Sequence, residues 1–102
     1  MIKHIVMWKL KDFAEGASKE GNFKVIKAGL EGLTALMPQI VKIEVGRNFS
    51  DSPAAYDAAV YSEFENKADL DFYQDHPMHK KIADFVSKVR TDRAVVDYIW
   101  ED

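Results

Sequence analysis

The sequence contains no cysteine, which excludes disulfide bonds, thiolate metal ligands and a cysteine nucleophile. It also lacks any apolar run near the ~20 residues that a membrane-spanning helix needs, and its first residues lack the uninterrupted apolar stretch of a signal peptide. Basic residues are not in excess, since the formal net charge is -3, whereas nucleic-acid binding requires clustered lysine and arginine. We therefore expect a cytoplasmic protein that binds neither membranes nor nucleic acid.

Two common signatures of catalysis are missing as well. Gly29 and Gly32 fall inside an expected helix, so they do not form a glycine-rich loop that binds phosphate. No serine occupies the setting of a nucleophile elbow. Repeats, low-complexity tracts and linkers are absent too, and 102 residues leave room for one domain only, which spans residues 1–102.

The spacing of the apolar residues, by contrast, is regular and predicts both strands and helices. Ser18 and Asn66 are expected to cap helices, and Pro38 to help end one. Pro77 suits the first position of a helix. The expected elements are strands at 2–11, 40–45, 56–64 and 94–100, a long helix at 18–37 and two shorter helices at 67–74 and 77–88.

The order of these elements is β-α-β-β-α-β, the ferredoxin-like pattern. The expected fold class is therefore α+β, with the helices on one face of a four-stranded antiparallel sheet. Yet the strand at 2–11 also carries Ile5 and Met7 on its second face, and a bare apolar face of this size is rare in monomers. We expect a homodimer in which two sheets form a dimeric α/β barrel. The alternative is a monomer whose open face is screened by lysine stems.

The candidate catalytic residues are His79 and Tyr73. His79 falls in the first turn of the helix that begins at Pro77, where the helix dipole disfavours positive charge and keeps the imidazole neutral. A neutral imidazole suits general acid–base catalysis near pH 7, and Tyr73 offers a hydroxyl to polarise a carbonyl. The structural alternative is a capping or packing histidine beside a core tyrosine, and spacing alone favours that alternative.

The other two histidines have different settings. His4 lies on the most apolar face of the first strand, where a lone histidine is usually a structural residue. If that face looks into a cavity between two sheets, His4 would instead be a pocket residue. His76 and His79 have the spacing of a metal-binding pair, but His76 precedes the helix, so the usual same-face geometry does not apply. We expect no metal and no cofactor. Trp8 would line a pocket for a flat apolar ligand or pack in the core.

Two segments carry a resemblance to a known family. The opening residues 1–11, with their Lys-His-Ile-Val strand, and residues 73–79, Tyr-Gln-Asp-His-Pro-Met-His, resemble the stress-responsive dimeric A/B barrel family. The resemblance spans essentially the whole chain. It implies a ferredoxin-like protomer and a homodimer whose two sheets form a barrel.

The same resemblance implies roles for individual residues. In a plant polyketide cyclase of the family, the proposed acid–base pair corresponds to Tyr73 and His79, and a pocket histidine of the first strand corresponds to His4. A further pocket histidine of the cyclase falls at Ala58 here, so the resemblance does not imply the same substrate.

Two functions follow from these observations. The first is a cofactor-free enzyme acting on a small, mostly apolar carbonyl or aromatic compound, in which His79 moves a proton and Tyr73 orients or polarises the carbonyl. His4 and Trp8 would line its pocket. The second is a non-catalytic stress-response protein or a binder of a small hydrophobic ligand.

Overall fold

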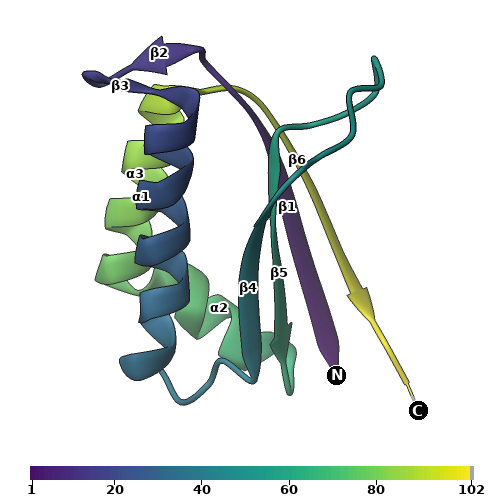
Figure 1. Cartoon of the computed structure of the whole chain (residues 1–102). Coiled ribbons are helices and arrows are strands. Elements are labelled where there is room, and N and C mark those ends of the chain that lie inside the picture. Colours follow the sequence, from purple (N-terminus) through teal and green to yellow (C-terminus); the bar gives the residue numbers. More distant parts are fainter. Residues whose placement is uncertain (102) are drawn as a thin grey trace.

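The protein has two layers, a four-stranded antiparallel sheet and a layer of helices on one of its faces (Figure 1). The structure is a computed structural model that describes residues 1–101. The main elements are the strands β1 Ile2–Leu10, β4 Lys42–Arg47, β5 Ala58–Phe64 and β6 Arg90–Ile99, and the helices α1 Lys19–Gly32, α2 Lys67–Asp75 and α3 Pro77–Val89. The short elements are the strands β2 Phe13–Ala14 and β3 Ala17–Ser18 and the 3-10 helix η1 Leu33–Ala35.

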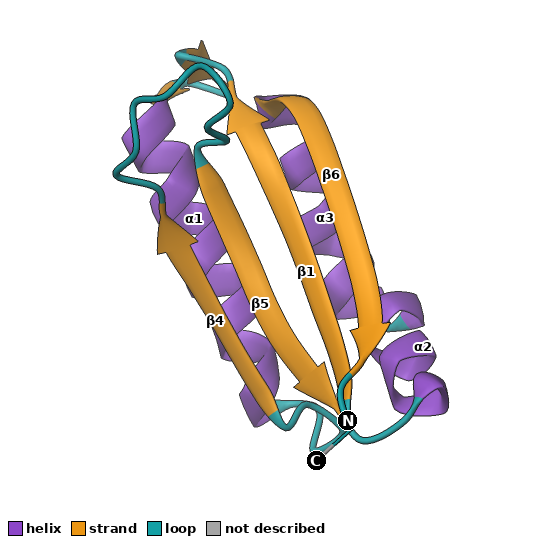
Figure 2. Ribbon diagram, turned by 90° about the vertical axis from the view of Figure 1, so that its right-hand side faces the viewer, coloured by secondary structure: helices purple, strands orange, loops and turns teal. Residues whose placement is uncertain are grey.

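The strand order β4-β5-β1-β6 confirms the expected ferredoxin-like α+β fold. Both inner strands run antiparallel to their neighbours, and Figure 2 shows the helices behind the sheet, with α1 and α3 running along it. Strand β1 lies in the middle of the sheet, and Ile2, Val6 and Trp8 are apolar residues of its helix-covered face. Each of them is at most 6% exposed in the core between the sheet and the helices.

Short polar side chains cap the N-termini of α1 and α2, as expected. Ser18 accepts a hydrogen bond of 3.1 Å from the Gly21 N–H at the start of α1, and Asn66 accepts one of 2.8 Å from the Asp69 N–H at the start of α2. These side chains satisfy N–H groups that have no partner inside the helix. Pro77 is the first residue of α3, where its missing N–H costs nothing.

Several boundaries differ from the sequence prediction. Strands β4 and β5 each begin two residues later than expected, at Lys42 and Ala58, and β4 also ends two residues later, at Arg47. Helix α1 ends at Gly32 and not at Met37, because the chain tightens into η1 at that point. Residues 13–18 form a small hairpin that the sequence did not predict, with positive φ angles at Glu15 and Gly16 in its turn. Strand β6 begins at Arg90 and not at Ala94, because it is an edge strand, where charged residues remain in contact with water.

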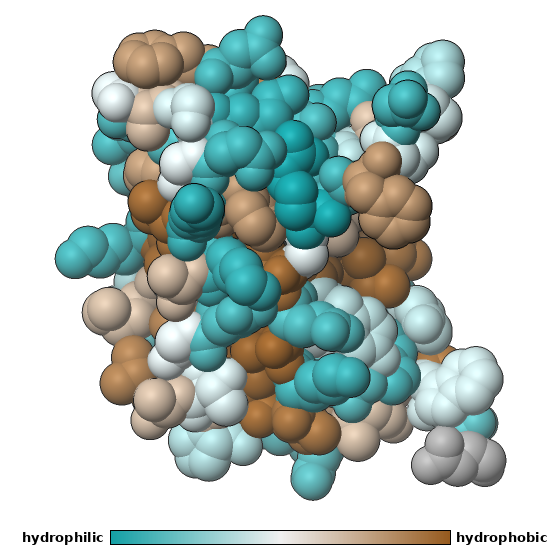
Figure 3. Space-filling view, in the orientation of Figure 1, coloured by the Kyte–Doolittle hydropathy of each residue, from teal (hydrophilic) through white to brown (hydrophobic). Residues whose placement is uncertain are grey.

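The face of the sheet away from the helices is apolar at its centre, as predicted. Ile5, Met7 and Tyr61 are only partly buried there, and Val96 is 49% exposed. Figure 3, which views the sheet from its edge, shows apolar and hydrophilic side chains interspersed on that side of the molecule. Within residues 1–101, no helix combines the length and apolar character needed to cross a membrane.

Candidate functional site

A cavity of about 340 Å³ lies between the sheet and α3 and is lined by all four side chains that the sequence singled out. His4 and Trp8 enter it from β1, Tyr73 from α2 and His79 from α3. The cavity therefore lies inside one chain, and the strand face that carries His4 looks towards the helices and not towards a second sheet. The reason is the strand alternation, which puts His4 and Trp8 on the face that the helices cover.

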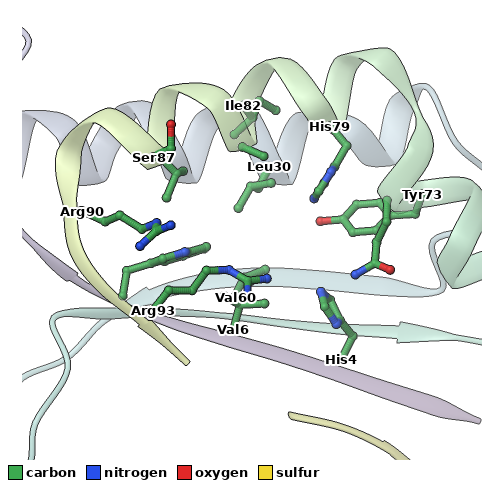
Figure 4. Close-up of a pocket in the computed structure, with 14 residues that line it drawn as sticks. His4, Val6, Leu30, Val60, Tyr73, His79, Ile82, Ser87, Arg90 and Arg93 are labelled. Carbon is green, nitrogen blue, oxygen red and sulfur yellow. The ribbon is translucent and has the colours of Figure 1, made fainter. Parts of the chain in front are cut away.

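Tyr73 and His79 form the centre of the cavity's polar end. Their ring centroids are 4.5 Å apart, with an angle of 57° between the planes, and Figure 4 shows both rings pointing into the cavity. The bend between α2 and α3 at His76 and Pro77 brings them together, because it turns the start of α3 back over the end of α2.

Both side chains are electrically neutral near pH 7. Burial raises the pKa of the Tyr73 hydroxyl well above its usual value, so the phenol keeps its proton and remains a hydrogen-bond donor. Burial also lowers the pKa of His79 below 6.5. A hydrogen bond with the Gln74 backbone opposes this shift, and electrostatic interactions with His4, Arg93 and His76 reinforce it. Among residues 1–101, the buried Nδ1 of His79 has no hydrogen-bond partner of standard geometry.

His4 is the third polar group at this end of the cavity. It is only 2% exposed, its ring lies edge-on to Tyr73 at 6.2 Å, and its Nδ1 is hydrogen-bonded to the Asp97 carboxylate of β6. An ionised carboxylate can only accept, so Nδ1 carries the proton and the lone pair of a neutral ring is on Nε2. Asp97 thereby fixes the orientation of a buried imidazole.

The remaining histidine has a structural role. Nδ1 of His76 accepts a hydrogen bond of 3.1 Å from the Met78 N–H and so caps α3. Its ring contacts Phe72 at a centroid distance of 6.0 Å. His76 does not line the cavity, whereas His79 does. Among residues 1–101, no group of three histidine, aspartate or glutamate side chains has the arrangement of a metal site.

The sequence analysis missed four polar residues of the cavity, Gln74, Ser87, Arg90 and Arg93. Figure 4 shows Arg90 and Arg93 at the end of the cavity opposite to Tyr73 and His79. The arginines were missed because residues 90–93 were expected to lie outside the last strand. Extending the alternation of β6 backwards from Val95 by two residues would have placed Arg93 on the helix-covered face, where it pairs opposite Trp8.

The cavity thus has three zones. Titratable rings occupy one end, Val6, Val60, Leu30 and Ile82 line the apolar middle, and guanidinium groups lie at the other end. This arrangement can hold a small apolar molecule with a carbonyl oxygen against the Tyr73 hydroxyl and can exchange a proton with a neutral imidazole.

Comparisons with known proteins agree with this fold. The family model described as "Stress responsive A/B Barrel Domain" matches residues 2–100. An uncharacterized protein of Streptomyces coelicolor is 36% identical over 83 residues, which cover 78% of this chain and 80% of that protein.

Two solved structures are similar over nearly the whole chain. A dimeric protein of unknown function and ferredoxin-like fold from Bacteroides fragilis has a TM-score of 0.83 and 34% identity, covering 97% of this chain and 95% of its own. A hydroxynitrile lyase from Passiflora edulis has a TM-score of 0.81 at 20% identity, covering 99% of this chain and 94% of its own. The second similarity concerns the fold alone.

Proposed function

Because the chain belongs to the stress responsive A/B barrel domain family, we propose that it is a cytoplasmic, homodimeric, cofactor-independent enzyme that moves a proton on a small apolar carbonyl or aromatic compound. The observation that carries this proposal is the pairing of a protonated phenol and a neutral imidazole in one cavity, with ring centroids 4.5 Å apart. Tyr73 is the hydrogen-bond donor and His79 is the base.

The proposed step needs only these two groups. His79 takes a proton from the carbon next to the substrate carbonyl, and the electron pair of that C–H bond moves towards the carbonyl oxygen. The Tyr73 hydroxyl donates a hydrogen bond to the oxygen as negative charge develops there. The imidazolium then returns the proton to the same or a neighbouring atom, which gives an isomerisation or starts a cyclisation.

Trp8 and His4 complete the substrate pocket in this proposal. Trp8 is 4% exposed in the core and offers a flat apolar surface to an aromatic substrate. His4 is held by Asp97 and lies opposite Tyr73, so its Nε2 can accept a hydrogen bond from a substrate hydroxyl. A protein of the same fold is a hydroxynitrile lyase, which supports the assignment of an enzyme to this architecture.

In this proposal, the second subunit packs on the open face of the sheet. Ile5, Met7, Tyr61 and Val96 form an apolar centre there, and the similar protein of Bacteroides fragilis is a dimer. A second copy of the chain packed on this face would remove the patch from water. The cavity is on the other side of the sheet, so each protomer would keep its own site.

The test is the exchange of the methyl protons of acetophenone in D₂O, followed by proton NMR. We expect catalysis by the wild type, and a loss of about 10²–10⁴-fold for His79→Ala and Tyr73→Phe. His76→Asn is the matched control, because it removes a neighbouring histidine outside the cavity while keeping a side chain that caps α3. Its exchange rate should equal that of the wild type.

Binding without turnover is the second candidate function, and the apolar middle of the cavity favours it. In that case acetophenone would raise the melting temperature of the protein, while the exchange rate would match that of buffer. Such a result, with folded protein, would contradict the enzymatic proposal.

A further inference from the structure

The cavity has a cationic end that proton transfer does not use. Arg90 and Arg93 both line it, and Figure 4 shows their side chains extending from the β6 end towards the middle, facing Tyr73 and His79 across the apolar residues. The chain carries a net charge of -3. The two guanidinium groups therefore make this cavity locally positive in a protein that is negatively charged overall.

In the described part of the chain, no carboxylate forms an ion pair with these two arginines. Among residues 1–101, neither takes part in an ion pair, whereas Arg47, the remaining arginine of the sequence, contacts Glu20 at 2.8 Å and Asp57 at 3.9 Å. The cavity lining contains no aspartate or glutamate.

The nearest acidic residues in the sequence are directed elsewhere. Asp92 is opposite Lys9 in the sheet, on the face away from the cavity. Asp97 shares the cavity face with Arg93, but its carboxylate is bound to His4 Nδ1. Up to residue 101, the guanidinium groups therefore have no carboxylate partner, although they line a partly buried cavity.

We infer that the ligand of this cavity carries a carboxylate, which Arg90 and Arg93 bind, at the end of its apolar body opposite to the reacting carbonyl. Guanidinium groups bind carboxylates through paired, charge-assisted hydrogen bonds. This inference rests on the proposed function for the position of the carbonyl and extends it by naming the substrate class, small apolar keto acids and related aryl carboxylates. The apolar middle, with Leu30 and Ile82, separates the two polar ends.

A matched pair of ligands tests the inference. 3-Benzoylpropionate has an aryl ketone at one end and a carboxylate at the other, and its amide, 4-oxo-4-phenylbutanamide, has nearly the same shape without the charge. By isothermal titration calorimetry at low ionic strength, we expect the wild type to bind the carboxylate at least about tenfold more tightly than the amide. Added salt should weaken this preference, because Arg93 lies at the exposed rim.

The double variant Arg90→Gln/Arg93→Gln should lose the preference. Its control is Lys80→Gln/Lys81→Gln, which removes two positive charges from exposed positions of α3 that do not line the cavity. The control should keep the preference, and circular dichroism should show that both variants are folded. Equal affinity of the wild type for the two compounds, no binding of either at millimolar concentration, or an equal loss in the lysine control would overturn the inference.

The outcome is independent of the test of catalysis. If the arginine variant loses the preference for the carboxylate and acetophenone exchange is absent, the results support the anion site and contradict the enzymatic proposal. If His79→Ala abolishes exchange while the wild type binds the carboxylate no more tightly than the amide, the results support the enzymatic proposal and contradict the anion site.

Discussion

At the scale of single residues, burial sets the protonation states on which the proposed chemistry depends. Tyr73 is 1% exposed, and removal from water raises the pKa of its hydroxyl. The same effect lowers the pKa of His79. An acid and a base are thus both uncharged in one cavity, and neither needs a charged partner to remain so.

The pH dependence of His79 provides a first prediction. The pKa of His79 in the folded protein lies below 6.5, so the unfolded chain takes up the proton at a higher pH than the folded chain does. The neutral imidazole therefore contributes to the free energy of unfolding above pH 6.5, and this contribution is lost as the pH falls through the folded-state pKa. We expect an NMR titration midpoint below 6.5, with the resonance assigned through His79→Gln. Acetophenone exchange should decrease only on the acid side of this midpoint. A midpoint at or above 6.5 would contradict the assignment of His79 as a neutral base.

Asp57 is a second residue with an unusual environment, at the end of the sheet near β2 and β3. It accepts a hydrogen bond of 2.7 Å from the Leu10 N–H and lies 3.3 Å from the Lys19 ammonium. Burial alone would raise the pKa of Asp57, but these contacts and Arg47 outweigh it, so the pKa lies below its usual value. Asp57 therefore joins β1, β5 and the start of α1.

We predict that Asp57→Ala lowers the free energy of unfolding by about 1–3 kcal/mol near neutral pH. A carboxyl whose pKa is depressed by folding stabilises the protein above its unfolded pKa, and this stabilisation is lost as the pH falls through the folded value. Urea unfolding should therefore show a smaller difference between variant and wild type at about pH 3 than at about pH 7. A difference that does not change with pH would mean that the Asp57 charge contributes nothing.

At the scale of elements, the contact between α1 and α3 limits the width of the cavity. Gly29 of α1 faces Ile82 of α3, and a Cβ at Gly29 would lie 3.2 Å from the Ile82 side chain. Ile82 also lines the cavity, so a larger residue at Gly29 would push it towards the ligand. At Gly32, three residues further along, a Cβ would meet nothing within 4 Å.

This pair of glycines gives a third prediction. Gly32→Ala should raise the free energy of unfolding by up to about 1 kcal/mol, because alanine favours the helix without a new contact. Gly29→Ala should be less stabilising, since the same gain is opposed by the contact with Ile82, and it should weaken binding of 3-benzoylpropionate. Urea unfolding and calorimetry of both variants make the comparison. Equal effects of the two substitutions on stability and binding would show that Ile82 adjusts freely.

At the scale of the whole molecule, the two faces of the sheet differ in what covers them. The helix-covered face contains the core and the cavity, whereas the open face holds the apolar patch around Ile5 and Val96. Burial of about 25 cal/mol per Å² of apolar surface provides the driving force for association through the open face. In the proposed function, dimer formation and ligand binding would therefore use opposite sides of one sheet.

The fourth prediction concerns assembly. Val96→Glu places a charge in the centre of the open face, and sedimentation should show a monomer at concentrations where the wild type is a dimer. Val25→Glu is the control, because Val25 is exposed to a similar extent, 52% against 49%, but lies on α1. A folded Val96→Glu protein that stays dimeric, or a monomeric wild type, would exclude this face as the interface.

The sequence alone determined the order of elements, the fold class and the apolar character of both sheet faces, because these depend on local periodicity and on short caps such as Ser18 and Asn66. It also identified Tyr73, His79, His4 and Trp8 as candidates. Only the tertiary structure decided that these four side chains line one cavity, because they come from three elements that meet only after folding. It also placed the cavity between the sheet and α3, and added Arg90 and Arg93. An edge strand that begins among charged residues has no apolar alternation to mark its start, so the sequence did not show that both arginines reach the cavity.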